Sequence, residues 1–248
     1  MHFKDYFSKR SEDYAKYRPV YPKKLFEHLA SIAPSRELAW DCATGNGQAA
    51  CALSQIFSRV VATDASSSQL EHATHHDRVV YKVARAEDSG LESHSVDLIT
   101  VAQALHWFDL DKFYAEAKRV LKTEGALAVW SYNLINVSPE IDEVIKRFYK
   151  EIVGPYWPPE RRLVEEGYNS VPFPFREIET PQFDMRARWT LDDFLGYLRT
   201  WSATQKFMEK NEVDPLLSIN DELLALWGEP ESEKQVRWPL KLRVGIAP

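Results

Sequence analysis

The chain has 248 residues, of which 44% are hydrophobic and 27% charged, enough to bury the core of an α/β domain. Its formal net charge of −6 argues against a protein that binds a phosphate backbone, since such proteins usually present a basic face. The amino terminus lacks the apolar core of a signal peptide, and no stretch of about 18 apolar residues could span a bilayer. We therefore expect a cytoplasmic protein that binds neither nucleic acid nor membrane.

Residues 38–133 alternate short β-rich runs with helical stretches. The β-rich runs are "LAWDC", "RVVATD", "VVYKVA", "VDLITVA" and "ALAVWSY", and the helical stretches between them include "GQAACALSQIF" and "LDKFYAEAKRVL". This order predicts βαβ units, and hence a parallel sheet covered by helices on both faces. Gly125 is predicted to end the helix that precedes the fifth strand.

The rhythm changes after residue 133. Helical patterns at 139–153 and 158–168 lead into a Pro-rich loop, after which the alternating runs "FDMRARWT" and "QVRWPLKLRVGI" flank helical stretches at 191–209 and 214–227. Alternating polar and apolar residues are typical of edge or solvent-facing strands. The pattern predicts one α/β domain: a Rossmann-like, seven-stranded, mostly parallel sheet with helices on both faces. We expect its last strand to be antiparallel and its carboxyl-terminal part to carry a helical insert.

A Gly-rich turn follows the first predicted strand, in "LAWDCATGNGQAA". Its segment from Gly45 to Ala50 matches the dinucleotide fingerprint G-x-G-x-x-A, and Asp64 follows at a spacing that suits a ribose. An NAD(P)-dependent oxidoreductase is therefore one reading. Asp41 argues against this reading, because an acid before the turn would repel a pyrophosphate. It suits a cofactor with ammonium and sulfonium groups. A loop cap is the alternative role for Asp41.

Four ordered motifs carry a resemblance to a known family. Asp41-x-Ala43-x-Gly45-x-Gly47 is similar to the motif D-x-G-x-G-x-G of class I S-adenosylmethionine-dependent methyltransferases, with Ala43 replacing a glycine. We expect the backbone of Ala43 to avoid positive φ, since alanine is otherwise strained. The segments "VVATDASSSQLEHA", "VARAEDSGL" and "VAQALHWFD" follow in the family's order. The last resembles the subgroup around trans-aconitate methyltransferase.

The resemblance implies S-adenosylmethionine as the cofactor and assigns residues to it. Asp64 would accept hydrogen bonds from both ribose hydroxyls, and Ala86 and Glu87 would contact the adenine edge. The family often has an acid where Arg85 stands. The implied cofactor-binding residues are Asp41, Ala43, Gly45, Gly47, Asp64, Ala65, Ala86, Glu87 and Gln103.

His106 follows the fourth strand, at the end of the sheet where open α/β sheets bind ligands. It is the candidate catalytic base if the acceptor is a hydroxyl, with a packed structural histidine as the alternative. A carboxylate acceptor needs no base, and Arg18 or Arg199 could then orient the anion. The insert around Trp201 is expected to wall the acceptor site. The predicted substrate residues are Tyr14, Arg18, Trp107 and Trp201.

These features predict methyl transfer to a small-molecule acceptor, with a carboxylate or hydroxyl oxygen favoured. A non-catalytic S-adenosylmethionine-binding protein is a second alternative. The histidines of "HATHHD" are interpreted as a solvated helix face, so no metal is expected, and the protein is expected to be a monomer or homodimer. The predicted division is a helical lid at 1–37, a cofactor-binding core at 38–133, and closing strands with the insert at 134–248.

Overall fold

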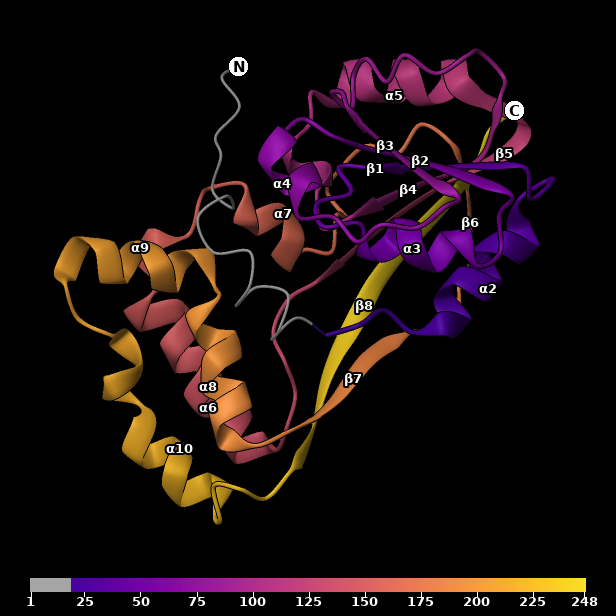
Figure 1. Cartoon of the computed structure of the whole chain (residues 1–248). Coiled ribbons are helices and arrows are strands. Elements are labelled where there is room, and N and C mark those ends of the chain that lie inside the picture. Colours follow the sequence, from indigo (N-terminus) through magenta and orange to yellow (C-terminus); the bar gives the residue numbers. More distant parts are fainter. Residues whose placement is uncertain (1–18) are drawn as a thin grey trace.

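A computed structural model of the chain describes residues 19–248. The predicted substrate residues Tyr14 and Arg18, and much of the predicted lid, lie outside the described residues. Five parallel strands form the centre of the sheet: β1 (Leu38–Cys42), β2 (Arg59–Asp64), β3 (Val79–Val83), β4 (Val96–Ala102) and β5 (Leu121–Tyr132). They stand in the order β3-β2-β1-β4-β5, which confirms the predicted parallel core (Figure 1).

The long strand β8 (Lys234–Ile246) closes the sheet by pairing antiparallel with β5. Two further strands, β6 (Arg176–Ile178) and β7 (Asp184–Trp189), pair with opposite ends of β8, so the sheet has eight strands instead of the predicted seven. The additional strand is β6, which lies in the Pro-rich stretch predicted as a loop. It has only three residues, too few to show the alternation by which a strand is recognised.

Helices cover both faces of the sheet because alternate strand residues point to opposite sides. On β5, Ala128 and Trp130 belong to the same apolar cluster as α2 (Lys23–Ile32) and α3 (Gln48–Ser54). The neighbouring Val129 belongs to a second cluster, which α5 (Leu110–Val120) shares. Figure 1 shows α5 on one side of the sheet and α2 and α3 on the other. The short helix α4 (Ser67–Glu71) follows β2.

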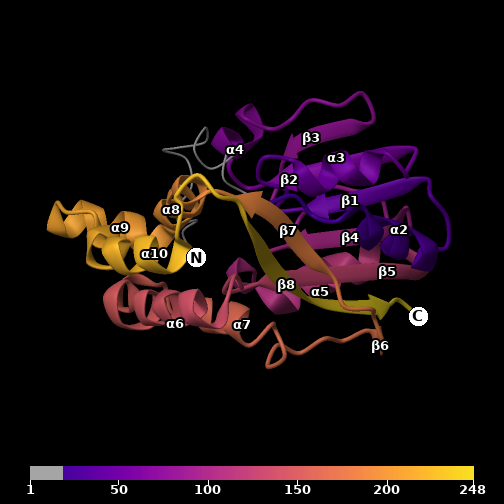
Figure 2. The same ribbon diagram turned by 90° about the horizontal axis from the view of Figure 1, so that it is seen from below.

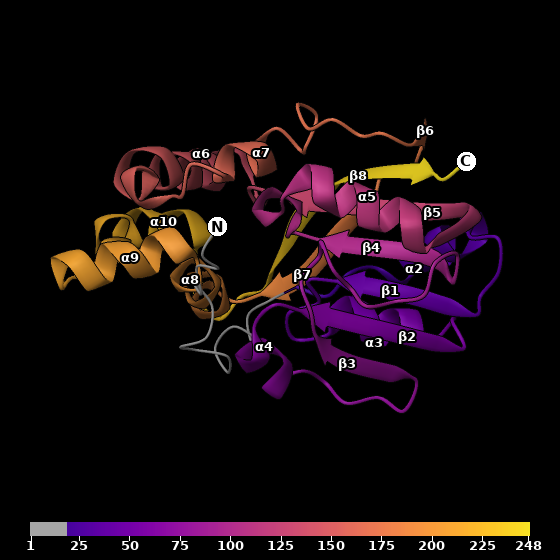
Figure 3. The same cartoon turned by 90° about the horizontal axis from the view of Figure 1, so that it is seen from above.

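The helical insert lies beyond the carboxyl ends of the parallel strands (Figures 2 and 3). Its helices are α6 (Pro139–Arg147), α7 (Arg161–Glu165), α8 (Leu191–Arg199), α9 (Ser202–Asn211) and α10 (Asn220–Trp227). Short turns interrupt the longer predicted stretches: the π-helical turn η2 (Phe148–Ile152) and the 3₁₀ turns η3 (Gly154–Tyr156) and η4 (Pro215–Ser218). Buried residues of α6, α8 and α10 belong to the same cluster as α2 and α3, so core and insert share one apolar interior.

Gly125 does not end a helix as predicted. Helix α5 ends at Val120, β5 begins at the next residue, and the pairing with β4 shifts register before Ala126. In this irregularity a side chain at position 125 would come within 2.8 Å of the carbonyl oxygen of Lys122. Gly125 is therefore explained by close backbone approach within the strand.

Candidate active site

The Gly-rich turn links β1 to α3 and uses left-handed backbone at alternate residues. The φ angles are 55° at Ala43, 56° at Gly45 and 82° at Gly47. The expectation that Ala43 avoids positive φ is therefore wrong: it adopts the conformation that the family gives to glycine, at a cost of about 1 kcal/mol. Gly47 has a further reason to be glycine, because a Cβ there would lie 2.1 Å from the Tyr81 hydroxyl oxygen.

Asp41 lies behind this turn and is only 1% exposed. Its two carboxyl oxygens accept hydrogen bonds from the hydroxyls of Thr44, at 2.5 Å, and Thr100, at 2.7 Å. Burial raises the pKa of Asp41 to about 6, and the nearby charge of Asp64 acts in the same direction. Since Thr44 is part of the turn, Asp41 holds the turn in shape from within the protein.

Asp64 ends β2 and joins that strand to the turn. Its Oδ2 accepts from the backbone N–H of Gly45 and its Oδ1 from that of Ser66, both at 2.9 Å. A carboxylate can accept about four hydrogen bonds, so holding the turn and binding a ribose are compatible roles. The adjacent Ala65 is exposed at the same strand end. The turn and the predicted ribose acid therefore lie side by side.

The predicted adenine residues lie in the loop between β3 and β4. Ala86 is buried, and Glu87 accepts a hydrogen bond from the backbone N–H of Asp109 at 2.9 Å. Its other oxygen lies 3.3 Å from Nε of Arg85. Glu87 therefore connects the loop to the start of α5. Arg85, which stands where the family often has an acid, partly neutralises the charge of Glu87.

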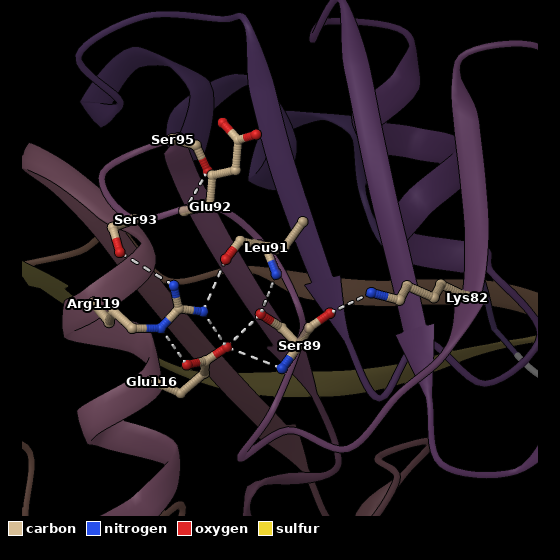
Figure 4. Close-up of polar contacts among 8 residues, drawn as sticks. All are labelled: Lys82, Ser89, Leu91, Glu92, Ser93, Ser95, Glu116 and Arg119. Carbon is tan, nitrogen blue, oxygen red and sulfur yellow. Dashed lines mark hydrogen bonds and ion pairs between the residues drawn. The ribbon is translucent and has the colours of Figure 1, made fainter.

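A network around Glu116 fixes the far end of the same loop to α5 (Figure 4). Glu116 accepts from the backbone and hydroxyl of Ser89 and forms an ion pair with Arg119 at 2.7 Å. Arg119 also donates to the carbonyl of Leu91 and the hydroxyl of Ser93. Burial opposes ionisation of Glu116, but the bonds from Arg119 and Ser89 outweigh it and lower its pKa to about 2. The loop is thus held at both ends.

Gln103 leaves β4 with a left-handed backbone, φ 57°. Its N–H donates to the carbonyl of Trp130 and its side-chain amide to that of Tyr132, so it bridges β4 and β5. Within residues 19–248 its buried Oε1 has no hydrogen-bond partner. A buried acceptor without a donor is costly, and this one lies at the strand end where a ligand would bind.

His106 lies in the 3₁₀ turn η1 (Leu105–Trp107) after β4. Its Nδ1 lies 3.0 Å from the hydroxyl oxygen of Tyr168, and its ring centroid lies 4.5 Å from that of Trp107, which is 37% exposed. This contact joins η1 to the segment that follows α7, and the imidazole tautomer decides which of Nδ1 and the Tyr168 hydroxyl is the donor.

The pKa of His106 follows from the same surroundings. Burial, and secondarily the positive charge of Arg161, lower this pKa to about 3. The imidazole is therefore neutral at physiological pH, and it is a weak proton acceptor. The sequence predicts the position of His106 but not Tyr168, which lies 62 residues away along the chain and carries no motif.

The positive charge that acts on the pKa of His106 is that of Arg161, a residue that was not predicted from the sequence. Its Nε donates to the hydroxyl of Tyr149 at 2.8 Å and its Nη2 to Oδ1 of Asn133 at 2.7 Å. Arg199, one of the two arginines offered as candidates to orient a carboxylate, is ion-paired with Asp214 at 3.0 Å. A helix start after consecutive prolines, in "PPERR", is the signal that could have drawn attention to Arg161.

Trp201 lies in the insert behind the rings that contact Arg161. It is 5% exposed and packs against Tyr149 and Trp157, with centroid distances of 5.7 and 5.8 Å. The same two rings border a surface hollow of about 350 Å³, to which Pro158 and Arg161 also contribute. Trp201 is therefore placed to support an aromatic wall.

Among residues 19–248, no group of three or more histidine, cysteine or acidic side chains is arranged to hold a metal ion. None of the helices in this part of the chain is long and apolar enough to cross a membrane.

The sheet order and the Gly-rich turn beside an acidic strand end define a Rossmann-like class I methyltransferase. Comparison with known proteins agrees: residues 40–129 match the family model described as a methyltransferase domain. A Dictyostelium discoideum protein described as a methyltransferase is 34% identical over 94% of this chain and 90% of its own length. The chain belongs to the class I S-adenosylmethionine-dependent methyltransferases, and its cofactor is S-adenosylmethionine.

Two further relatives extend the likeness beyond the cofactor core. A Saccharomyces cerevisiae protein described as an S-adenosylmethionine-dependent methyltransferase is 25% identical over 83% of each chain. A solved structure from Anaeromyxobacter dehalogenans, described as a type II methyltransferase, is 46% identical, with a TM-score of 0.88 over 92% of this chain and 97% of that one. The likeness therefore includes the insert. It also decides against the oxidoreductase reading, and none of these descriptions states a methyl acceptor.

Proposed function

We propose that this enzyme methylates an oxygen of a small-molecule acceptor, and that a carboxylate is preferred over a hydroxyl. The observation that carries the proposal is the packing of His106, whose Nδ1 contacts the Tyr168 hydroxyl at 3.0 Å and whose ring lies against Trp107, because this burial lowers the pKa of the imidazole to about 3. A base of this strength is poorly matched to removing the proton of an alcohol or phenol at neutral pH. A carboxylate is already ionised there and needs no base.

We assign cofactor-binding roles to the Gly-rich turn and to the residues that surround it. Asp64 binds the ribose, Ala86 and Glu87 border the adenine, and the backbone at 43–47 approaches the methionine part. Gln103 Oε1 is the acceptor for the ammonium group, since it lacks a donor among the described residues. Asp41 acts through Thr44, whose hydroxyl it holds.

When bound, S-adenosylmethionine supplies a methyl group on a sulfonium, which an acceptor oxygen can displace in line. The protein's part is to align the acceptor and exclude water. In this proposal Nδ1 of His106 accepts from the Tyr168 hydroxyl, and the Nε2–H donates to one oxygen of the acceptor. Trp107 offers an aromatic face beside His106, suited to a positively charged sulfonium. Tyr149 and Trp157 form the wall of the acceptor side, with Trp201 behind them.

A test of this proposal uses S-adenosylmethionine labelled in its methyl group. The protein is incubated with matched sets of small acceptors in which a carboxylic acid, its primary amide and the corresponding alcohol or phenol share one skeleton. The proposal predicts label on the acid, released as methanol by mild alkali because the product is an ester. Label on a phenol or alcohol that survives alkali would instead support the hydroxyl alternative.

A further inference from the structure

Among residues 19–248, the partly buried Arg161 has no directly paired acid, and Glu165 is linked to it only through the Tyr149 hydroxyl, which donates to Glu165 at 2.6 Å. The two hydrogen bonds of Arg161, to Tyr149 and Asn133, go to neutral oxygens. No carboxylate of residues 19–248 lies within ion-pair distance of it, whereas the part-buried Arg243 is paired with Glu177. Removing a cation from water with no acid directly against it is unfavourable, so a site of this kind is suited to receiving an anion.

The guanidinium is also held in one orientation. Its Cζ lies 4.7 Å from the ring centroid of Trp157 and 5.6 Å from that of Tyr149. The donors at Nε and Nη2 are engaged by protein oxygens, which leaves Nη1 without a partner among the described residues. A pre-oriented guanidinium loses little conformational freedom when it binds a planar oxyanion.

The location of Arg161 connects the insert to the chemistry. It begins α7, which packs on η1, and it donates to Asn133 just after β5 ends. Its charge acts on His106 and Tyr168, and its side chain also borders the surface hollow beside Trp157. A small molecule can therefore reach it from solvent, at the same end of the sheet as the predicted methyl donor.

We propose that Arg161 is the specificity-determining residue that binds the carboxylate of the methyl acceptor. The inference rests on the proposed function. Nη1 donates to one carboxylate oxygen, and the other oxygen forms the new bond to the methyl carbon as the carbon–sulfur bond breaks. The sulfonium and carboxylate charges both disappear, giving a thioether and a neutral ester. Because the ester no longer forms an ion pair, Arg161 discriminates between acceptor and product and favours product release.

The experiment compares Arg161→Gln and Arg161→Lys with the wild type, and uses Arg176→Gln as the control. Arg176 is an exposed arginine on β6 whose partner is Glu124, so it is a matched loss of charge away from this site. Benzoate, benzamide and phenyl phosphate serve as probes. Their binding to protein saturated with S-adenosylhomocysteine is measured by calorimetry, and methyl transfer to the best carboxylic acid of the acceptor panel is measured in parallel.

We expect Arg161→Gln to weaken benzoate binding and raise the acceptor KM by about 10- to 100-fold, the range for one charge-assisted hydrogen bond. kcat should change less than threefold, benzamide binding should not change, and Arg161→Lys should be intermediate. S-adenosylhomocysteine affinity and thermal midpoint should match the wild type. Stronger binding of phenyl phosphate than of benzoate would overturn the carboxylate assignment.

The two proposals fail in different ways. If benzoate binding depends on Arg161 but no acid is methylated, the carboxylate-binding role of Arg161 is supported and the proposed function is contradicted. If acids are methylated with an unchanged KM in both Arg161 variants, only the carboxylate-binding role of Arg161 is contradicted. Equal losses for benzoate, benzamide and S-adenosylhomocysteine would show that Arg161 only supports the fold, and this also overturns the inference.

Discussion

Ala43 is an alanine in a left-handed backbone conformation that usually favours glycine. At φ 55°, alanine is strained by about 1 kcal/mol, but glycine would lose more conformational freedom on folding. We expect Ala43→Gly to change the free energy of unfolding by less than about 1 kcal/mol. Ala43→Val should destabilise by about 2 kcal/mol or more, because a β-branched residue tolerates this region poorly. Urea unfolding measures both, and a tolerated valine would argue against the left-handed turn.

The titration of Asp41 makes the free energy of unfolding depend on pH. Its folded-state pKa of about 6 lies above the ordinary 3.8, so the folded state binds its proton more tightly. The stabilising effect of that proton is complete below about pH 4 and is lost as the pH rises through about 6. Asp41→Asn removes the titration, so its stability relative to the wild type should rise across this range. Unfolding free energies at pH 4.5 and 7.5 provide the test, and a pH-independent difference would contradict it.

His106 separates the two acceptor chemistries. If the acceptor is a carboxylate, His106→Ala should change kcat by less than about 10-fold and act mainly on acceptor affinity, because only a hydrogen bond is lost. Loss of a general base would instead lower kcat by about 10²- to 10⁴-fold. Steady-state kinetics with a carboxylic acid acceptor decide between these results, and Arg176→Gln again serves as the unaffected control.

The residues that sequence analysis found and missed differ in one physical respect. Asp41, Gly45, Gly47 and Asp64 are constrained by the backbone of one turn and one strand end, so their spacing is visible in the sequence. Arg161 acts through contacts with residues 12 and 28 positions away, which no local pattern reports.

Among the contacts between elements, the network of Glu116 and Arg119 with Ser89, Leu91 and Ser93 joins α5 to the β3–β4 loop, and we call it the clamp (Figure 4). Glu116→Gln removes its charge, and we expect a loss of about 1 to 3 kcal/mol in the free energy of unfolding at pH 7. The contribution of the ionised Glu116 is present above about pH 4.5 and disappears as the pH falls toward 2. S-adenosylhomocysteine affinity should fall as well, because Ala86 and Glu87 lie in the clamped loop.

A surface carboxylate supplies the control for the clamp. Glu143 on α6 is 71% exposed and paired with Lys146, so Glu143→Gln should change stability by less than about 0.5 kcal/mol. Chemical unfolding and calorimetry are run on both variants. If Glu116→Gln behaves like Glu143→Gln in both measurements, the clamp does not position the loop.

Elements with buried periodicity were predictable, and elements defined by tertiary pairing were not. The predicted runs at 38–42, 59–64 and 96–102 coincide with β1, β2 and β4, because all three are almost entirely buried and read as continuous apolar stretches. In contrast, β6 exists only because β8 provides a partner, and the break between α8 and α9 falls at Trp201, whose backbone turns extended where its ring enters the aromatic cluster.

At the scale of the whole molecule, the sheet supplies the cofactor turn and the insert supplies the anion-binding arginine, and they meet at the carboxyl end of β4. We expect the methyl donor to lie between Asp64 and His106, and a crystal structure with S-adenosylhomocysteine would locate it. Both ribose hydroxyls should contact Asp64, and the sulfur should lie on the His106 side of the turn, facing Arg161 across the acceptor space. A ribose bound elsewhere, or a sulfur directed away from His106 and the insert, would refute this placement.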